Sequence, residues 1–136
     1  MIDGTGSPMF GADVAVKGNS IVAVGEVTGE ASREVDASGK VVTPGFIDLH
    51  THSDNSFLID PYADSKLTQG VTLELMGNCG MSDCAPLNEN TVEELRSRTE
   101  KYAPDFKPTW TTMDGYLTAL EKSGSTINIA AQIGHG

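Results

Sequence analysis

The stretch PGFIDLHTHSDNSF, residues 44–57, places two histidines one position apart directly after an apolar run. The whole chain contains three histidines, so this one motif holds two of them. Successive side chains of an extended strand point to opposite faces, and His50 and His52 are therefore expected to share a face. Neutral imidazole is a common ligand of zinc and similar metals, so the pair favours a metal site. The simpler alternative is a pair of hydrogen-bonded loop histidines.

The residues before this motif, 1–43, indicate a small β module. The segment ADVAVKGNSIVAVGEV, residues 12–27, alternates apolar and polar positions on both sides of Gly18 and Asn19. This pattern predicts a hairpin with a two-residue turn. A further short strand is expected at residues 34–36. Gly and Pro are frequent in this part of the chain and helical periodicity is absent.

Residues 44–136 alternate predicted strands with predicted helices. The strands are FIDLHTH (46–52, mainly buried), VTLELMGNCG (71–80) and INIAAQIGHG (127–136). The first helix is expected to begin at Pro61, with Asp60 as N-cap and Gly70 just past its end. Two more helices are expected over 91–102 and over 111–124, where Thr111 is the expected cap and Gly124 the stop. This alternation is typical of an α/β fold with a parallel sheet. Three such strands cannot close a barrel, so we expect a piece of a larger fold.

The histidines and Cys79 all fall where predicted strands end. The carboxyl ends of parallel strands meet at one edge of the sheet, where such folds hold their sites. Cys79 lies in GNCG, and two imidazoles with a thiolate favour zinc; the alternative is a small buried thiol at a tight turn. Asp48 shares the expected face of the histidines. His135 is compatible with a metal ligand, a hydrogen-bond donor to a ligand, or a substrate contact.

The composition argues against several classes of protein. The net charge of −10 disfavours nucleic acid or an anionic membrane as the main partner. No run approaches the roughly 18 apolar residues of a membrane span, and no basic and apolar leader is visible, so a cytoplasmic location is expected. The two cysteines are expected to be thiols or metal ligands rather than a disulfide. Sequence motifs of serine hydrolases, P-loop proteins and dinucleotide-binding proteins are missing.

Taken together, these stretches resemble the amidohydrolase superfamily and, within it, the D-aminoacylase (N-acyl-D-amino-acid deacylase) branch. The matching segments run from end to end and include IDGTGSP, DVAVKGNSIVAVG, GKVVTPGFIDLHTHSD, KLTQGVT, GNCG followed by APL, YLTALE and INIAAQIGHG. The resemblance implies that residues 44–136 contain the first three strands of a (β/α)8 TIM-type barrel. It also implies that residues 1–43 are part of a small β-sandwich.

The resemblance further implies a zinc-dependent hydrolase that converts N-acyl-D-amino acids to a D-amino acid and a carboxylate. His50 and His52 would be metal ligands, Cys79 a thiolate ligand, and the general-base aspartate would come from beyond Gly136. The 136 residues alone are then expected to be inactive. The alternatives are a hydrolase of cyclic amides in the same superfamily, or a non-catalytic chain that binds a metal or a partner. Glu74 and the pair Asp83 and Cys84 depart from the family pattern, in which these positions are apolar or small.

Overall fold

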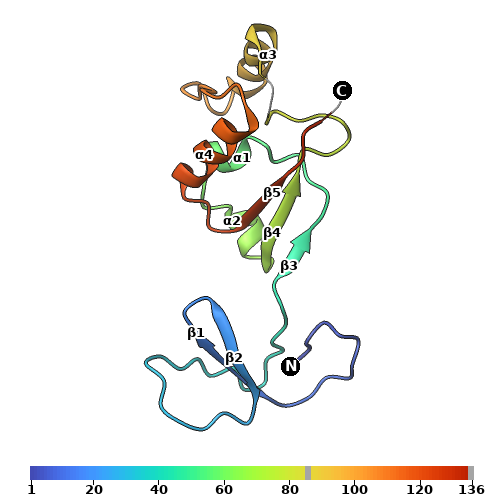
Figure 1. Ribbon diagram of the computed structural model, residues 1–136, viewed down its shortest axis with the longest axis vertical. Coiled ribbons are helices and arrows are strands. Elements are labelled where there is room, and N and C mark those ends of the chain that lie inside the picture. Colours follow the sequence, from blue (N-terminus) through green and yellow to red (C-terminus); the bar gives the residue numbers. More distant parts are fainter. Residues whose placement is uncertain (85–86, 135–136) are drawn as a thin grey trace. The chain divides into compact units, whose positions relative to one another are not determined.

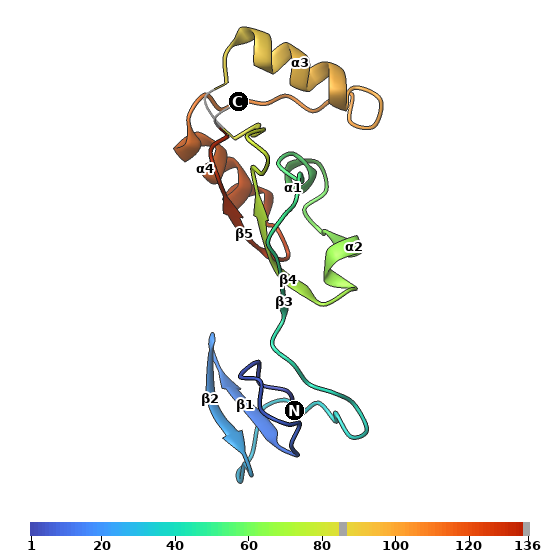
Figure 2. The same ribbon diagram turned by 90° about the vertical axis from the view of Figure 1, so that its right-hand side faces the viewer.

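The computed structural model describes residues 1–84 and 87–134. The chain divides into two compact units, Met1–Pro44 and Gly45–Gly136. Each unit contains a sheet of its own (Figures 1 and 2). In the part of the chain that is described, no helix has both the length and the apolar character needed to cross a membrane.

The first unit is built around one antiparallel hairpin. Strand β1 (Asp13–Lys17) pairs with β2 (Ser20–Gly25), and Lys17 lies opposite Ser20 across the turn. Gly18 has a φ of +59° in this turn, a conformation that a glycine adopts without steric penalty. The hairpin predicted around Gly18 and Asn19 is therefore confirmed.

The strand expected at residues 34–36 does not form. The Asp36 carboxylate accepts a hydrogen bond of 2.8 Å from the backbone N–H of Ser38, which closes a local turn instead of extending the chain. Val35 is 75% exposed, so no burial of its side chain favours a strand here. The sequence-based prediction of this strand was wrong.

The second unit contains a three-stranded parallel sheet. Its strands are β3 (Phe46–Asp48), β4 (Val71–Met76) and β5 (Asn128–Ala131), and β4 lies between the other two. Both pairings are parallel, as predicted. The carboxyl ends of the three strands consequently lie at the same edge of the sheet (Figure 1).

The first of these strands is shorter and more exposed than predicted. Strand β3 ends at Asp48, and Phe46, Ile47 and Leu49 are 58–66% exposed. Strand β3 is an edge strand with one neighbour, and the described residues leave the side chain of Ile47 uncovered. The histidines therefore follow the strand rather than lying within it.

The core of the second unit forms between the sheet and its helices. Glu74 and Met76 of β4 are fully buried, and Met76 Sδ accepts a hydrogen bond from the hydroxyl of Tyr116. The buried apolar side chains are Phe57, Ala63, Met76, Cys84, Leu87, Leu95, Trp110, Tyr116, Leu120 and Ile127. The helices are α1 (Ser56–Ile59), α2 (Asp64–Leu67), α3 (Glu89–Thr99) and α4 (Met113–Ser123).

All three predicted helix starts were wrong, whereas one predicted stop is confirmed. The helix expected over 91–102 spans Glu89–Thr99, and the side chain of Asn88 caps it. The helix expected from Pro61 begins at Asp64, because the Asp60 carboxylate accepts the N–H of Tyr62 and fixes a turn there. The cap of α4 is Thr112 and not Thr111, and its hydroxyl accepts the N–H of Gly115 at 3.1 Å. Gly124, with a φ of +73°, ends α4 as predicted.

Candidate metal centre

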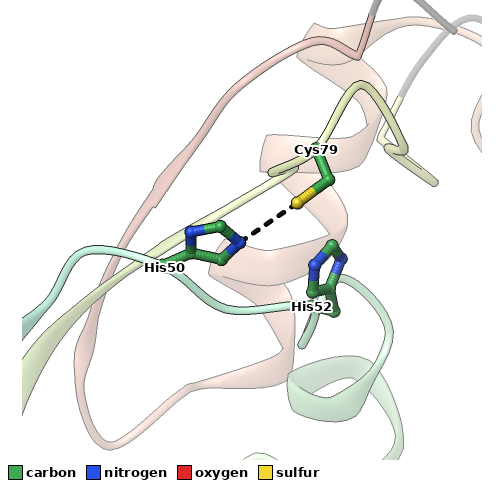
Figure 3. A group of neighbouring side chains, drawn as sticks. All are labelled: His50, His52 and Cys79. Carbon is green, nitrogen blue, oxygen red and sulfur yellow. Dashed lines mark hydrogen bonds between the residues drawn. The ribbon is translucent and has the colours of Figure 1, made fainter.

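His50, His52 and Cys79 come together at the carboxyl edge of the parallel sheet. One ligand atom from each lies within 4.8 Å of the others, and all three side chains are exposed. His50 Nε2 lies 3.2 Å from Cys79 Sγ, and the two imidazole ring centroids are 5.6 Å apart. Figure 3 shows the thiol and both rings directed toward a common region.

The residue between the histidines anchors them to β4. Thr51 is 5% exposed, and both its N–H and its hydroxyl donate to the carbonyl oxygen of Leu75, at 3.2 and 3.1 Å. Thr51 therefore points into the protein, whereas His50 and His52 stay exposed beside the carboxyl end of β4. The alternation expected for a strand persists across these residues although β3 has already ended.

The turn that carries Cys79 has an unusual backbone. Cys79 has a φ of +61°, which a residue with a Cβ rarely adopts. The side-chain amide of Asn78 donates to the carbonyls of Thr51 and Leu75 at 3.2 and 2.9 Å. The first of these hydrogen bonds joins the turn to the residue between the two histidines. A Cβ at Gly77 would overlap the carbonyl oxygen of Gln132, so the turn also packs closely against the residues that follow β5.

Asp48 is not among the converging ligand atoms. Its Oδ2 accepts a hydrogen bond of 2.7 Å from the ammonium of Lys66, and its Oδ1 accepts the N–H of His50 at 3.3 Å. The Lys66 hydrogen bond holds the pKa of Asp48 below its usual value, and the same contact raises the pKa of Lys66. Asp48 therefore remains a carboxylate that orients the His50 backbone.

Sequence analysis missed three residues that surround this centre, namely Ser53, Lys66 and Asn78. The Ser53 hydroxyl donates to Glu74, and Lys66 contacts both Asp48 and Glu74. Glu74, a charged residue in a mainly apolar strand, was the sequence signal that could have indicated Ser53 and Lys66, because a buried carboxylate requires a partner. That signal did not say which residue the partner would be.

Two sequence candidates remain, His135 and Cys84. His135 lies outside the described residues. Cys84 is a free thiol that is completely buried, with Sγ 3.4 Å from Asp54 Oδ1. Burial raises the pKa of Cys84 to about 11, so this thiol stays protonated and is a poor metal ligand at neutral pH.

The donor set fits zinc. Structural and catalytic zinc ions take imidazole nitrogen and thiolate sulfur at about 2.0–2.3 Å, which separates two tetrahedral ligands by about 3.5 Å. The His50–Cys79 distance of 3.2 Å is near this value, and the largest separation of 4.8 Å requires a movement of roughly 1 Å by one side chain. Three protein ligands are also the number that catalytic zinc sites commonly have.

Comparison with known proteins identifies relatives of this chain. A family model described as "Amidohydrolase family" matches residues 33–136. N-acyl-D-glutamate deacylase and D-aminoacylase of Alcaligenes xylosoxydans xylosoxydans are 40% and 38% identical to this chain over 99% of its length. The chain spans 27% of each of these relatives, or about a quarter of their length.

Solved structures give a consistent result. The crystal structure of N-acyl-D-glutamate deacylase from Bordetella bronchiseptica, complexed with zinc and a phosphonate inhibitor, superposes with a TM-score of 0.80. It is 40% identical, and the match covers 98% of this chain and 28% of that one. A structure of D-aminoacylase, described in terms of the functional role of its binuclear metal centre, matches with a TM-score of 0.76 and 36% identity, and the match covers 98% of this chain and 28% of that one. The chain therefore belongs to the amidohydrolase family and has the mixed α/β fold of the corresponding part of the D-aminoacylases, as its sequence motifs indicated.

Proposed function

We propose that the protein containing this chain is a zinc-dependent hydrolase that converts N-acyl-D-amino acids and water to a D-amino acid and a carboxylate. The observation that carries this proposal is the convergence of His50, His52 and Cys79 at the carboxyl edge of a parallel sheet. The similarity to deacylases at 40% identity supports the substrate class.

The proposal includes the architecture of the whole protein. Strands β3, β4 and β5 are the first three strands of a (β/α)8 barrel, and Met1–Pro44 is part of a small β-sandwich. A barrel of this kind takes about 250 residues, whereas this chain spans 27% of its curated relatives. The exposed apolar side chains of Ile47 and Leu49 support the assignment, since the interior of a closed barrel is packed with such residues.

Each residue of the centre has a stated task in this proposal. His50 and His52 hold the ion through neutral imidazole nitrogens, and Cys79 holds it after its thiol has lost a proton. A zinc ion bound there supplies polarisation of the scissile carbonyl and activation of water. The general base is an aspartate beyond Gly136, and His135 is a further ligand, a donor to a ligand or a substrate contact.

The test is a hydrolysis assay on the full-length protein with N-acetyl-D-methionine, N-acetyl-D-glutamate and the two L enantiomers. We expect release of D-amino acid, loss of activity on removal of metal by a chelator, and recovery on addition of zinc. The 136-residue chain assayed in parallel with zinc is expected to give no measurable product. Hydrolysis of a cyclic amide such as a hydantoin in place of these substrates would overturn the proposed substrate class, and turnover that withstands complete metal removal would overturn the zinc requirement.

A further inference from the structure

Glu74 is a charged residue in a place that the fold alone does not explain. It lies between Leu73 and Leu75 in the central strand of the sheet, and its side chain is completely buried. Its Oε2 has no hydrogen-bond partner among the described residues. Burial of a carboxylate is unfavourable, and an apolar side chain would fill this position without that penalty.

Glu74 is connected by contacts to both ends of residues 49–55, which contain His50 and His52 and are called the histidine segment below. Its Oε1 accepts a hydrogen bond of 2.5 Å from the hydroxyl of Ser53, the residue after His52. The same oxygen lies 3.6 Å from the ammonium of Lys66, which donates to Asp48 at 2.7 Å. Asp48 in turn accepts the backbone N–H of His50.

The histidine segment needs such contacts because regular structure does not hold it. Strand β3 ends at Asp48, and the next helix, α1, begins at Ser56. Between these limits the Thr51 N–H is the backbone donor that continues the pairing with β4. Groups that lock the orientation of metal ligands typically change metal affinity 10–100-fold when removed.

We propose that Glu74 is a positioning residue, which holds His50 and His52 in the metal-binding arrangement through Ser53 on one side and through Lys66 and Asp48 on the other. This inference rests on the proposed function, in which the two histidines bind zinc. Glu74 itself does not touch the metal or the substrate in this proposal.

The sharpest test uses Ser53→Ala, which removes the hydrogen bond from residue 53 to Glu74 without placing a new group in the core. Ser56→Ala is the matched control, because Ser56 is exposed and its hydroxyl makes no hydrogen bond to the described residues. Glu74→Gln, which retains an oxygen acceptor for Ser53 but loses the charge, separates the hydrogen bond from the ion pair. Zinc affinity of the full-length protein is measured by competition with a chromophoric chelator. We expect about tenfold weaker binding for Ser53→Ala, restoration by Ser53→Thr, and no change for Ser56→Ala.

A second measurement on metal-free protein distinguishes this inference from the proposed function. Amide hydrogen exchange of a peptide covering residues 49–55 is expected to be about tenfold faster in Ser53→Ala and Glu74→Gln than in the parent, while exchange in α4 is unchanged. Absence of zinc binding by the parent would overturn the proposed function, and the exchange rates would still decide the positioning role. Unchanged exchange in residues 49–55, or an equal acceleration in α4, would overturn that role.

Discussion

His50 Nε2 lies 3.2 Å from Cys79 Sγ, although 29 positions separate the two residues in the chain. The parallel pairing of β3 with β4 brings the residues that follow each strand to the same edge of the sheet. The left-handed backbone at Cys79 then turns its thiol toward the histidines (Figure 3). The contact between nitrogen and sulfur therefore depends on sheet topology and on one strained turn.

This contact predicts unequal effects of removing the two cysteines. Cys79→Ala should abolish most zinc binding by the chain, because it deletes one of three converging ligand atoms. Cys84→Ala should leave zinc binding nearly intact, because the Cys84 thiol is buried and protonated. Zinc titration of both variants beside the parent checks this, and binding should weaken at low pH as the ligands take up protons. Equal losses in the two variants would contradict the assignment.

Asn78 supplies a second prediction about the same turn. Its amide donates to the carbonyls of Thr51 and Leu75, and so ties the Cys79 turn to the residue between the histidines. Asn78→Asp replaces this donor with a carboxylate that faces two carbonyl oxygens. We expect zinc affinity to fall about tenfold or more, whereas Asn90→Asp in the exposed first turn of α3 should have no effect. An equal affinity for the two variants in a competition titration would show that Asn78 does not orient the turn.

Part of this centre could be predicted from local sequence, and part could not. Each predicted strand is an apolar run followed by polar residues, and this pattern predicted that His50, His52 and Cys79 lie at one edge of the sheet. The prediction follows because the carboxyl ends of parallel strands lie at the same edge. The hydrogen bonds that Lys66 makes to Asp48 and that Asn78 makes to Thr51 and Leu75 join residues that meet only after the chain has folded. Local sequence patterns therefore do not predict these contacts.

The incorrect predictions of secondary structure also arise because local sequence signals do not include tertiary contacts. The helix expected from Pro61 and the strand expected at residues 34–36 had suitable local signals, yet Asp60 and Asp36 each hydrogen-bond to a nearby N–H and favour turns. Aspartate supports either a helix cap or a local turn. Burial of neighbouring residues decides between these outcomes, and Val35 gains none.

Gly77 offers a test of how closely the strand ends pack. It combines a φ of +79° with a position where a Cβ would overlap the carbonyl of Gln132. Gly77→Ala should reduce the free energy of unfolding by about 3 kcal/mol, the sum of left-handed strain and overlap. Gly124→Ala has a similar φ of +73° with open space around it, and should cost about 1 kcal/mol. Urea unfolding followed by the fluorescence of Trp110, the one tryptophan in the chain, measures both values. Equal losses would mean that the contact with Gln132 does not restrict this position.

Cys84 predicts a specific dependence of stability on pH. Burial raises the pKa of its thiol from 9.0 to about 11 in the folded protein. Between these values the unfolded thiol ionises while the folded thiol stays protonated, so the free energy of unfolding falls as pH rises and the contribution levels off above 11. The whole loss attributable to this thiol is about 3 kcal/mol, of which about 2 kcal/mol is reached by pH 11.

Comparison of the parent with Cys84→Ala isolates that contribution. Burial also raises the pKa of Tyr116, and this second group lowers the stability of both proteins at high pH. Interaction with Cys84 is a further cause of the raised pKa of Tyr116, so the difference between the two proteins reports on the thiol together with its coupling to Tyr116. Urea unfolding at intervals from pH 8 to pH 11, followed by Trp110 fluorescence, should show the parent losing about 2 kcal/mol more than Cys84→Ala. Parallel curves would mean that the Cys84 thiol ionises as readily in the folded protein as in the unfolded chain, contrary to its complete burial beside Asp54.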